Sequence, residues 1–271
     1  MKSFKSNDDL KVSIVIPTFN RPQLLDRLLN SITRQTFKDF EVIVIDDASP
    51  VVEDYKKVVR TYQTKIKRFR YLRMKDNSGA PQCRNKGILA AKYPLIALVD
   101  DDDDWLPRKL EKQLEIFSSD WKNVDLVYTW AYCIAKNGKK ILLKPEFEGV
   151  TLNDIYKENF IPSPSVLLKK DVLIKLKMFD PSFPSCQDWD LWIRLFQSGY
   201  KCRAVHDYLV NYYFGMSNNI STSPRVVSGY FQILKKHLRP AFESNFKNGF
   251  ILLNRCLTLL LKIKIKGTSK N

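Results

Sequence analysis

The chain has 271 residues and a net charge of +16, from 45 Lys and Arg against 29 Asp and Glu. A hydrophobic fraction of 44% with 12% aromatic residues indicates a globular fold and disfavours a disordered chain. The chain has only two histidines, which disfavours a Ser-His-Asp hydrolase. Its nine glycines form no dinucleotide-binding or P-loop motif, which disfavours the simplest nucleotide-binding sites.

The first hundred residues alternate between strand-like and helix-like segments. Residues 12–17 form a buried-strand run, and residues 20–35 follow as a helix with Asn20 as N-cap and Pro22 in its first turn. This order of elements predicts a mostly parallel sheet covered by helices. Further strands are expected at 41–45, 69–74 and 95–99, and further helices near 52–64 and 81–92.

The second half has a different pattern. Asn137-Gly138 lies between strand-like segments and predicts a hairpin. A short helix is expected near 171–177, and an amphipathic helix that starts at QDWDLW ends at Gly199. Two amphipathic helices follow from about 224. We expect a main domain of residues 1–223, comprising a nucleotide-sugar half (11–106) and an acceptor and catalytic half (107–223), with a basic helical extension at 224–271.

The C-terminal segment is strongly basic. From Arg225 onward it holds ten Lys and Arg and one acid, Glu243, which gives a net charge of +9. Its apolar and basic residues are typical of an interfacial helix, so we expect peripheral contact with an anionic membrane; a solvated basic face is the alternative. The sequence contains no spanning segment, no signal peptide and no C-x-x-C motif, so we expect a cytoplasmic protein. Together with the basic segment, this predicts a location at the inner face of the plasma membrane.

Polar residues follow three of the expected strands. They are Pro17-Thr18-Phe19-Asn20, Asp46-Asp47 and the five aspartates 100–104. In open α/β sheets, ligands bind at the carboxyl ends of the strands. Adjacent carboxylates raise one another's pKa unless a cation neutralises them, so we expect Mn²⁺ or Mg²⁺ bridging a diphosphate. The alternatives are a solvated acidic turn and a calcium loop, although Trp105 stands where a calcium loop needs glycine.

Three segments together resemble the family 2 glycosyltransferases of the GT-A fold, over roughly residues 11–215. They are VSIVIPTFNRPQLLDRLLNSITRQTFKDFEVIVIDDAS, NSGAPQCRNKGILAAKYPLIALVDDDDDWLPRKLEKQ and QDWDLWIRL. The resemblance implies a nucleotide-binding half and an acceptor-binding half on a mostly parallel sheet flanked by helices. It also implies metal-dependent, inverting transfer from a nucleotide sugar, a UDP-sugar in our interpretation. The expected acceptor is a glycan hydroxyl, on a lipid-linked surface polysaccharide of the O-antigen or capsule type.

The resemblance also assigns residues. At the nucleotide it places Pro17, Phe19, Asp47, Arg84, Asp100 and Asp101. It makes Asp102 the direct metal ligand, with Asp100 beside it, and Asp188 the base that takes the acceptor's proton. Asp46 is expected to be structural, and the acceptor candidates are Trp189, Asp190 and Trp105.

The sequence departs from the family pattern at two places. Gln187 stands where the family has Glu, and NYYFGMSNN lacks the histidine of the family's Tyr-Arg-x-His stretch, since His206 lies too early. For Asp188 the alternative role is a helix N-cap. Two other functions stay open: a nucleotidyltransferase, which would release pyrophosphate, and a basic module for nucleic acid. An acidic site disfavours the latter, and we expect no nucleic-acid partner.

Overall fold

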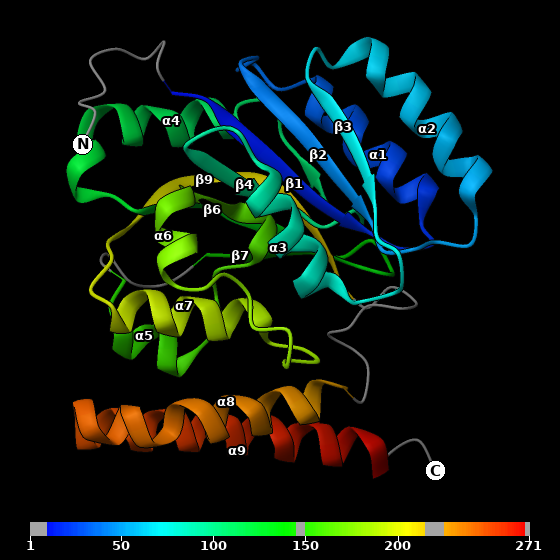
Figure 1. Cartoon of the computed structure of the whole chain (residues 1–271). Helices are drawn as coiled ribbons and strands as arrows, with labels where there is room; N and C mark the ends of the chain where they lie inside the picture. The colour runs from blue at the N-terminus through cyan, green and yellow to red at the C-terminus, as the bar shows by residue number, and fades with distance from the viewer. Residues whose placement is uncertain (1–9, 145–149, 215–224, 269–271) are drawn as a thin grey trace.

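The structure is a computed structural model that describes residues 10–144, 150–214 and 225–268. One sheet forms its centre, and helices cover both faces of this sheet (Figure 1). The strands are β1 (Val12–Thr18), β2 (Phe40–Asp46), β3 (Phe69–Arg73), β4 (Leu95–Leu98), β5 (Asp104–Trp105), β6 (Leu126–Ala135), β7 (Lys140–Leu143), β8 (Val166–Lys169) and β9 (Cys202–Phe214). The helices are α1 (Pro22–Thr33), α2 (Val52–Lys65), α3 (Ala80–Ala90), α4 (Lys109–Asp120), α5 (Leu152–Lys157), α6 (Lys170–Lys175), α7 (Gln187–Gln197), α8 (Arg225–Ser244) and α9 (Phe246–Thr268).

The two halves of the sheet differ in strand direction. The strand order is β3-β2-β1-β4-β8-β6-β9-β5, with β7 paired to the far end of β6. The first four strands in this order are parallel. In the second half β8 is antiparallel to both of its neighbours, β6 and β9 are parallel, and β5 is antiparallel to β9. A parallel sheet is therefore confirmed for the half that begins the chain, and the sheet as a whole is mixed.

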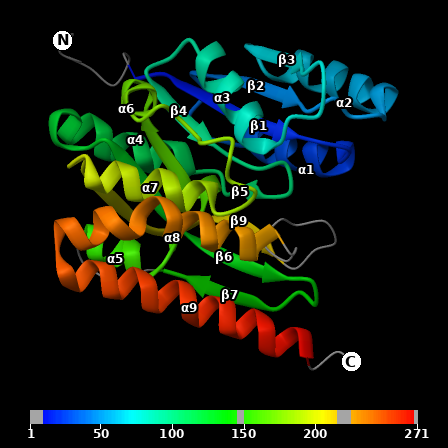
Figure 2. The same cartoon turned by 60° about the horizontal axis from the view of Figure 1, so that its bottom comes forward.

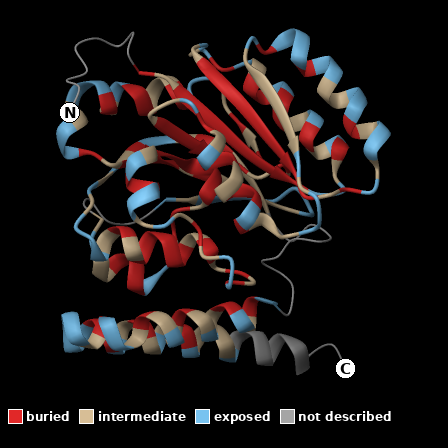
Figure 3. Cartoon of the chain, in the orientation of Figure 1, coloured by how far each residue is buried: buried red, intermediate tan, exposed pale blue. Residues whose placement is uncertain are grey.

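The alternating direction of side chains along the strands divides the core into two layers. Successive strand residues face opposite sides of a sheet. Ile14 and Ile16 of β1 pack in the layer with α1, α2 and α4, whereas Val15 packs in the layer with α3, α5, α6 and α7. Figure 3 shows the buried residues concentrated on the strands and on the helix sides that face them.

Most predicted elements are present, and one predicted cap is wrong. The predicted strands at 12–17, 41–45 and 95–99 correspond to β1, β2 and β4, and a turn at Asn137-Gly138 joins β6 to β7. Asn20, however, is not the N-cap of α1. It adopts a left-handed conformation, with φ of 54°, and the helix starts one residue later than expected, at Pro22.

The two C-terminal helices lie side by side against α5 and α7 (Figures 1 and 2). Ile233 of α8 and Leu252 of α9 belong to the same buried cluster as the apolar side of α7. The described part of the segment predicted as a basic extension, α8 and α9, therefore shares a core with the main domain. In the described part of the chain, no helix combines the length and apolar composition that crossing a membrane requires.

Gly87 sets the distance between α3 and the sheet. A Cβ atom at this position would lie 2.4 Å from Cγ1 of Val15 in β1, closer than two carbons can approach. We expect Gly87→Ala to lower the free energy of unfolding by about 1–3 kcal/mol, because overpacking outweighs the gain in helix propensity. Urea denaturation would measure this. Leu89→Ala, at a residue that is 60% exposed on the same helix, is the control and should change stability by about 0.5 kcal/mol or less. An unchanged Gly87→Ala protein would contradict this packing.

Candidate active site

The ends of β1 and β4 are joined by hydrogen bonds at one edge of the sheet. Thr18, the last residue of β1, donates from Oγ1 to Asp101 Oδ2 at 2.6 Å. The same hydroxyl lies 2.7 Å from the hydroxyl of Tyr55 on α2. The loops that follow β1 and β4 therefore meet, as the sequence predicts for parallel strands.

The two acids after β2 have different environments. Asp46 is fully buried, and its Oδ2 accepts hydrogen bonds from Tyr71 and Arg73, both at 2.6 Å. The Asp47 carboxylate instead accepts the backbone N–H groups of Ser78 at 2.7 Å and Gly79 at 2.8 Å. A structural role for Asp46 agrees with these contacts. The Asp47 side chain is buried, with the residue 4% exposed, and its role as acceptor for a nucleobase donor remains a prediction.

The β1 loop offers one exposed aromatic ring beside these acids. Phe19 is 42% exposed, whereas Pro17 is buried within β1 and lies opposite Ile45 of β2. Contact of Phe19 with a base would therefore require no rearrangement of the core. Pro17 can contribute only through its backbone or by shaping the loop.

Arginines bind the aspartate run. Arg21 lies 2.5 Å from Asp101 Oδ1 and 2.9 Å from Asp102 Oδ2, so it bridges two of the carboxylates. Arg27 donates to the backbone carbonyl of Asp102. The sequence analysis did not identify these two arginines as part of the site. Their position beside the β1 loop, at the same sheet edge as the acids, is the signal that could have identified them.

Burial dominates the electrostatics of the central acids. It raises the pKa of Asp101 to about 7, although Arg21 opposes this shift. Burial also raises the pKa values of Asp102 and Asp103, with repulsion from Asp100 adding to both shifts. Asp103 Oδ1 accepts the backbone N–H of Tyr213 at 2.9 Å, and Oδ2 is buried without a hydrogen-bond partner among the described residues.

Asp104 ties the acidic loop to the second half of the sheet. Its carboxylate accepts hydrogen bonds from the Asn211 amide at 2.6 Å and the Tyr213 hydroxyl at 3.0 Å, both on β9. Asn211 and Tyr213 lie in the stretch where the family histidine was sought. In this chain that stretch therefore anchors the acids through neutral side chains.

Asp188 lies in the first turn of α7. The helix begins at Gln187, with Cys186 as the N-cap residue, so the N-cap alternative for Asp188 is wrong. Asp188 Oδ1 accepts hydrogen bonds from the Asn159 amide at 3.1 Å and from the backbone N–H of Trp189 at 2.8 Å. Burial raises the pKa of Asp188, and these hydrogen bonds only partly oppose it. A carboxylate with a raised pKa is a stronger base than a solvated one.

Arg84 connects the acids to this helix. Its guanidinium donates from Nη2 to Asp100 Oδ1 at 2.5 Å and from Nη1 to Gln187 Oε1 at 3.0 Å. Arg84 is 7% exposed, and its guanidinium lies 5.2 Å from the centre of the Phe179 ring. One buried cation thus holds together the first acid of the aspartate run and the residue before Asp188.

Comparison with protein families agrees with this arrangement. Residues 13–177 match the model of glycosyl transferase family 2, which is more than half of the chain. The chain belongs to this family. The match contains the aspartate run and Arg84 and ends before α7.

Related proteins extend the likeness beyond the family model. The GalNAc(5)-diNAcBac-PP-undecaprenol beta-1,3-glucosyltransferase of Campylobacter jejuni is 30% identical over 294 residues, covering 95% of this chain and 90% of the relative. Residues 1–349 of S. aureus TarS, solved with UDP-GlcNAc, have a TM-score of 0.74 at 20% identity, covering 91% and 71%. A Pyrobaculum calidifontis mannosyltransferase with GDP-Man and Mn²⁺ has a TM-score of 0.67 at 16% identity, covering 94% and 75%. The two structures confirm the GT-A fold.

The acids of this family 2 glycosyltransferase suit a divalent cation. No group of three or more His, Cys, Asp or Glu side chains among the described residues is arranged as a ready metal site. Mg²⁺ and Mn²⁺ can, however, bind through one or two carboxylates plus substrate phosphates. Asp102 meets this need because its side chain is 14% exposed and Arg21 occupies only Oδ2. Oδ2 of Asp103 also has no hydrogen-bond partner among the described residues, which leaves it available for a proton or a cation.

The acceptor candidates of this glycosyltransferase lie in its interior. Trp189 and Trp105 are 1% and 2% exposed, and their indole N–H groups donate to the carbonyls of Ile155 at 2.7 Å and Pro164 at 2.9 Å. Asp190 is fully buried. Direct contact with an acceptor stays a prediction for these three residues, and their burial argues against it. Asn159, which binds Asp188, was not identified from the sequence.

The raised pKa of Asp101 predicts a stability that depends on pH. The folded protein keeps this proton up to about pH 7, whereas an unfolded chain releases it near pH 4. Without metal or nucleotide, stability should therefore fall as the pH rises from about 4 to about 7, by up to about 4 kcal/mol from this group. Asp101→Asn should flatten that slope in urea denaturation. Asp171→Asn, at an exposed acid on α6, should keep it; equal slopes for both variants would contradict this explanation.

Proposed function

We propose that the protein is an inverting, metal-dependent glycosyltransferase that moves a sugar from a UDP-sugar to a hydroxyl of a lipid-linked glycan. The bridge made by Arg84 carries this proposal, because it joins the first acid of the aspartate run to Gln187, the residue before Asp188. Acids for the diphosphate side and a base for the acceptor side are the two parts that a single displacement requires.

The chemistry follows from these positions. Asp188 takes the proton of the acceptor hydroxyl as its oxygen attacks the anomeric carbon. The bond from that carbon to the diphosphate oxygen breaks, and UDP leaves with the electron pair. One displacement of this kind inverts the configuration at the anomeric carbon. A divalent cation held by Asp102, with Asp100 beside it, would stabilise the charge that develops on the leaving diphosphate.

The choice of substrates rests on the relatives. TarS binds UDP-GlcNAc, which favours a UDP-sugar for this chain. The Campylobacter relative is named for a GalNAc(5)-diNAcBac-PP-undecaprenol substrate, which favours a lipid-linked saccharide as acceptor. Phe19, exposed beside Asp47 at the end of β1, is the side chain that we assign to the uracil ring.

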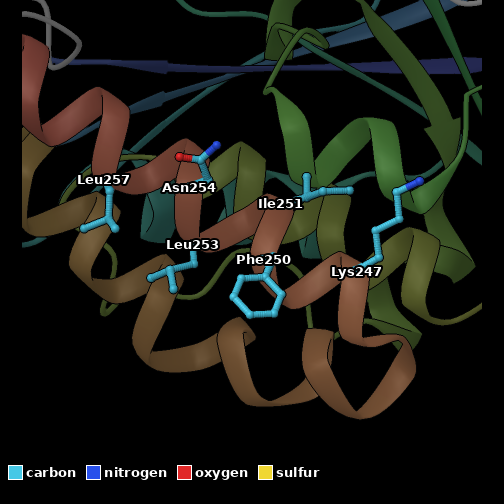
Figure 4. Close-up of a pocket in the computed structure, with 6 residues that line it drawn as sticks. All are labelled: Lys247, Phe250, Ile251, Leu253, Asn254 and Leu257. Carbon is cyan, nitrogen blue, oxygen red and sulfur yellow. The ribbon is translucent and has the colours of Figure 1, made fainter.

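An acceptor embedded in a membrane would require the enzyme to work at the bilayer surface. The outward side of α9 carries an apolar stripe at helical spacing, with Phe246 71%, Phe250 52% and Leu257 47% exposed. Phe250 and Leu257 also line a pocket of about 440 Å³ (Figure 4). This stripe is separate from the inward side of α9, where Leu252 is fully buried, so α9 has apolar residues on two sides.

The charge around this stripe favours an anionic membrane. The segment from Arg225 onward carries a net charge of +9, and Lys247 lies on α9 beside Phe246 and Phe250. Basic residues near anionic lipid contribute about 1 kcal/mol each, and exposed aromatic side chains prefer the interface between water and lipid. We therefore place the outward side of α9 in the cytoplasmic face of the membrane.

Asp188→Asn should strongly reduce sugar transfer and leave UDP binding intact. Loss of the general base is expected to lower the turnover number by about 10²–10⁴-fold. In the unmodified enzyme, activity should rise with pH to a plateau, with the acid limb above the ordinary Asp pKa because burial raises that of Asp188. Release of UDP, measured with a panel of sugar nucleotides, tests both points.

Asp102→Asn serves as the contrasting variant. It should lose the thermal stabilisation by Mn²⁺ with UDP, whereas Asp188→Asn should keep it. The exposed Asp171→Asn should match the unmodified enzyme in both assays. Release of pyrophosphate in place of UDP would instead support the nucleotidyltransferase alternative and overturn the proposal.

Substitution of Phe250 and Leu257 together by Ser should weaken binding to vesicles that contain anionic lipid. Loss of two buried apolar side chains should lower the affinity at least about tenfold, measured by co-sedimentation. Leu89→Ser, which changes a 60% exposed residue on α3, is the matched control and should bind normally. Equal binding to neutral and anionic vesicles, or a dimer in light scattering that Phe250→Ser disrupts, would contradict a membrane role for this stripe.

A further inference from the structure

Asp190 joins α7 to α8 in a buried cluster of charges. Its Oδ1 lies 2.8 Å from both His237 Nε2 and Lys236 Nζ on α8. Its Oδ2 accepts from Arg194 Nη2 at 2.7 Å. These partners hold the pKa of Asp190 well below its usual range despite full burial. Lys236 also lies 2.7 Å from Asp180, in the loop before α7.

The start of α8 contacts the turn that precedes Asp188. A Cβ atom on Gly229 would lie 2.1 Å from Ser185 Oγ and 3.1 Å from Cys186 Sγ, so only glycine permits this approach. Ser185 Oγ donates to the carbonyl of Arg225 at 3.1 Å. Cys186 itself has φ of 58°, a backbone conformation that surrounding contacts must maintain.

A third contact between α8 and α7 lies between the contacts of Gly229 and those of His237. The Tyr230 ring meets the Trp189 ring edge-on, with ring centres 6.2 Å apart. From its first turn to His237, α8 thus touches Ser185, Cys186, Trp189 and Asp190, which flank Asp188 on both sides. Asp188 itself bonds to Asn159 and the backbone of Trp189, so its place depends on the position of this turn.

We propose that α8 is a positioning element for the reaction, which holds the first turn of α7 so that Asp188 faces the acceptor oxygen. This inference rests on the proposed function. It gives residues 225–237, which lie outside the segment that matches the family model, an indirect part in catalysis, through the position of Asp188. Gly229 and His237 are its positioning residues.

Gly229→Ala tests the proposal, with Gly249→Ala as matched control. Both replace a helical glycine whose Cβ would meet a neighbour within 2.2 Å, but at Gly249 that neighbour is Phe242 of α8, away from α7. Gly229→Ala should lower the turnover number about 10–100-fold, since a displacement of about 1 Å has such an effect. The KM for donor and the affinity for UDP should stay unchanged. Gly249→Ala should keep turnover, although both variants lose some thermal stability.

A second pair of variants separates positioning from general stability. His237→Gln retains an N–H donor for Asp190, whereas His237→Leu removes it. Turnover should therefore be largely preserved in His237→Gln and reduced in His237→Leu, with equal UDP affinity. Equal turnover in both, or full turnover in Gly229→Ala, would overturn the proposal.

Hydrogen exchange gives a readout that does not depend on activity. In Gly229→Ala, and not in Gly249→Ala, the amides of residues 186–190 should exchange faster than in the unmodified protein. If the unmodified protein transfers no sugar, the proposed function fails, and the exchange data still decide whether α8 holds this turn. Unchanged exchange at 186–190 would overturn the positioning role in either case.

Discussion

The neutralisation of buried negative charge is the constraint on which this structure depends. Five consecutive aspartates follow β4, and two of them, Asp101 and Asp103, are almost inaccessible to water. Burying an unpaired carboxylate is so costly that the group must bind a cation or take up a proton. Arg21 and Arg84 supply positive charge from the β1 loop and from α3, and the remaining excess suits a divalent cation with a diphosphate. The loop is thus held in place by its arginines and by protonation of its most buried acids.

The same need for charge pairing connects the parts of the protein. Arg84 links the parallel half of the sheet to α7, and Asp190 links α7 to α8. These contacts are buried, so their geometry is fixed by packing as well as by attraction. The position of Asp188 therefore depends on residues that are distant in sequence. Several of these contacts, at Gln187 and Asp190, involve residues that lie after the family-matched segment 13–177.

The sequence predicts local features of this protein better than long-range ones. β1, β2 and β4 could be recognised because each is a mostly apolar run, and the polar residues that follow them identify the sheet edge where the acids gather. The sequence did not reveal Arg21 as the partner of Asp101, the burial of Trp105, or the contact of His237 with Asp190, because each depends on how distant segments pack. Asn20 was misassigned as a cap since its side chain is a good capping group, whereas its left-handed backbone is set by the β1 loop. The strand directions in the second half of the sheet could not be predicted either, because β8 and β9 pair with strands that are distant in the sequence.

The position of α8 in the chain has a consequence for biosynthesis. Chains emerge from the ribosome N-terminus first, and domains begin to fold as they emerge. The strands β1 to β4 can assemble early, but the turn at Cys186 makes its contacts with α8 only after β9 and α8 have been synthesised. Under the proposed function, a nascent chain could bind a sugar nucleotide before Asp188 is held in its position, and sugar transfer would become possible only once α8 has been synthesised.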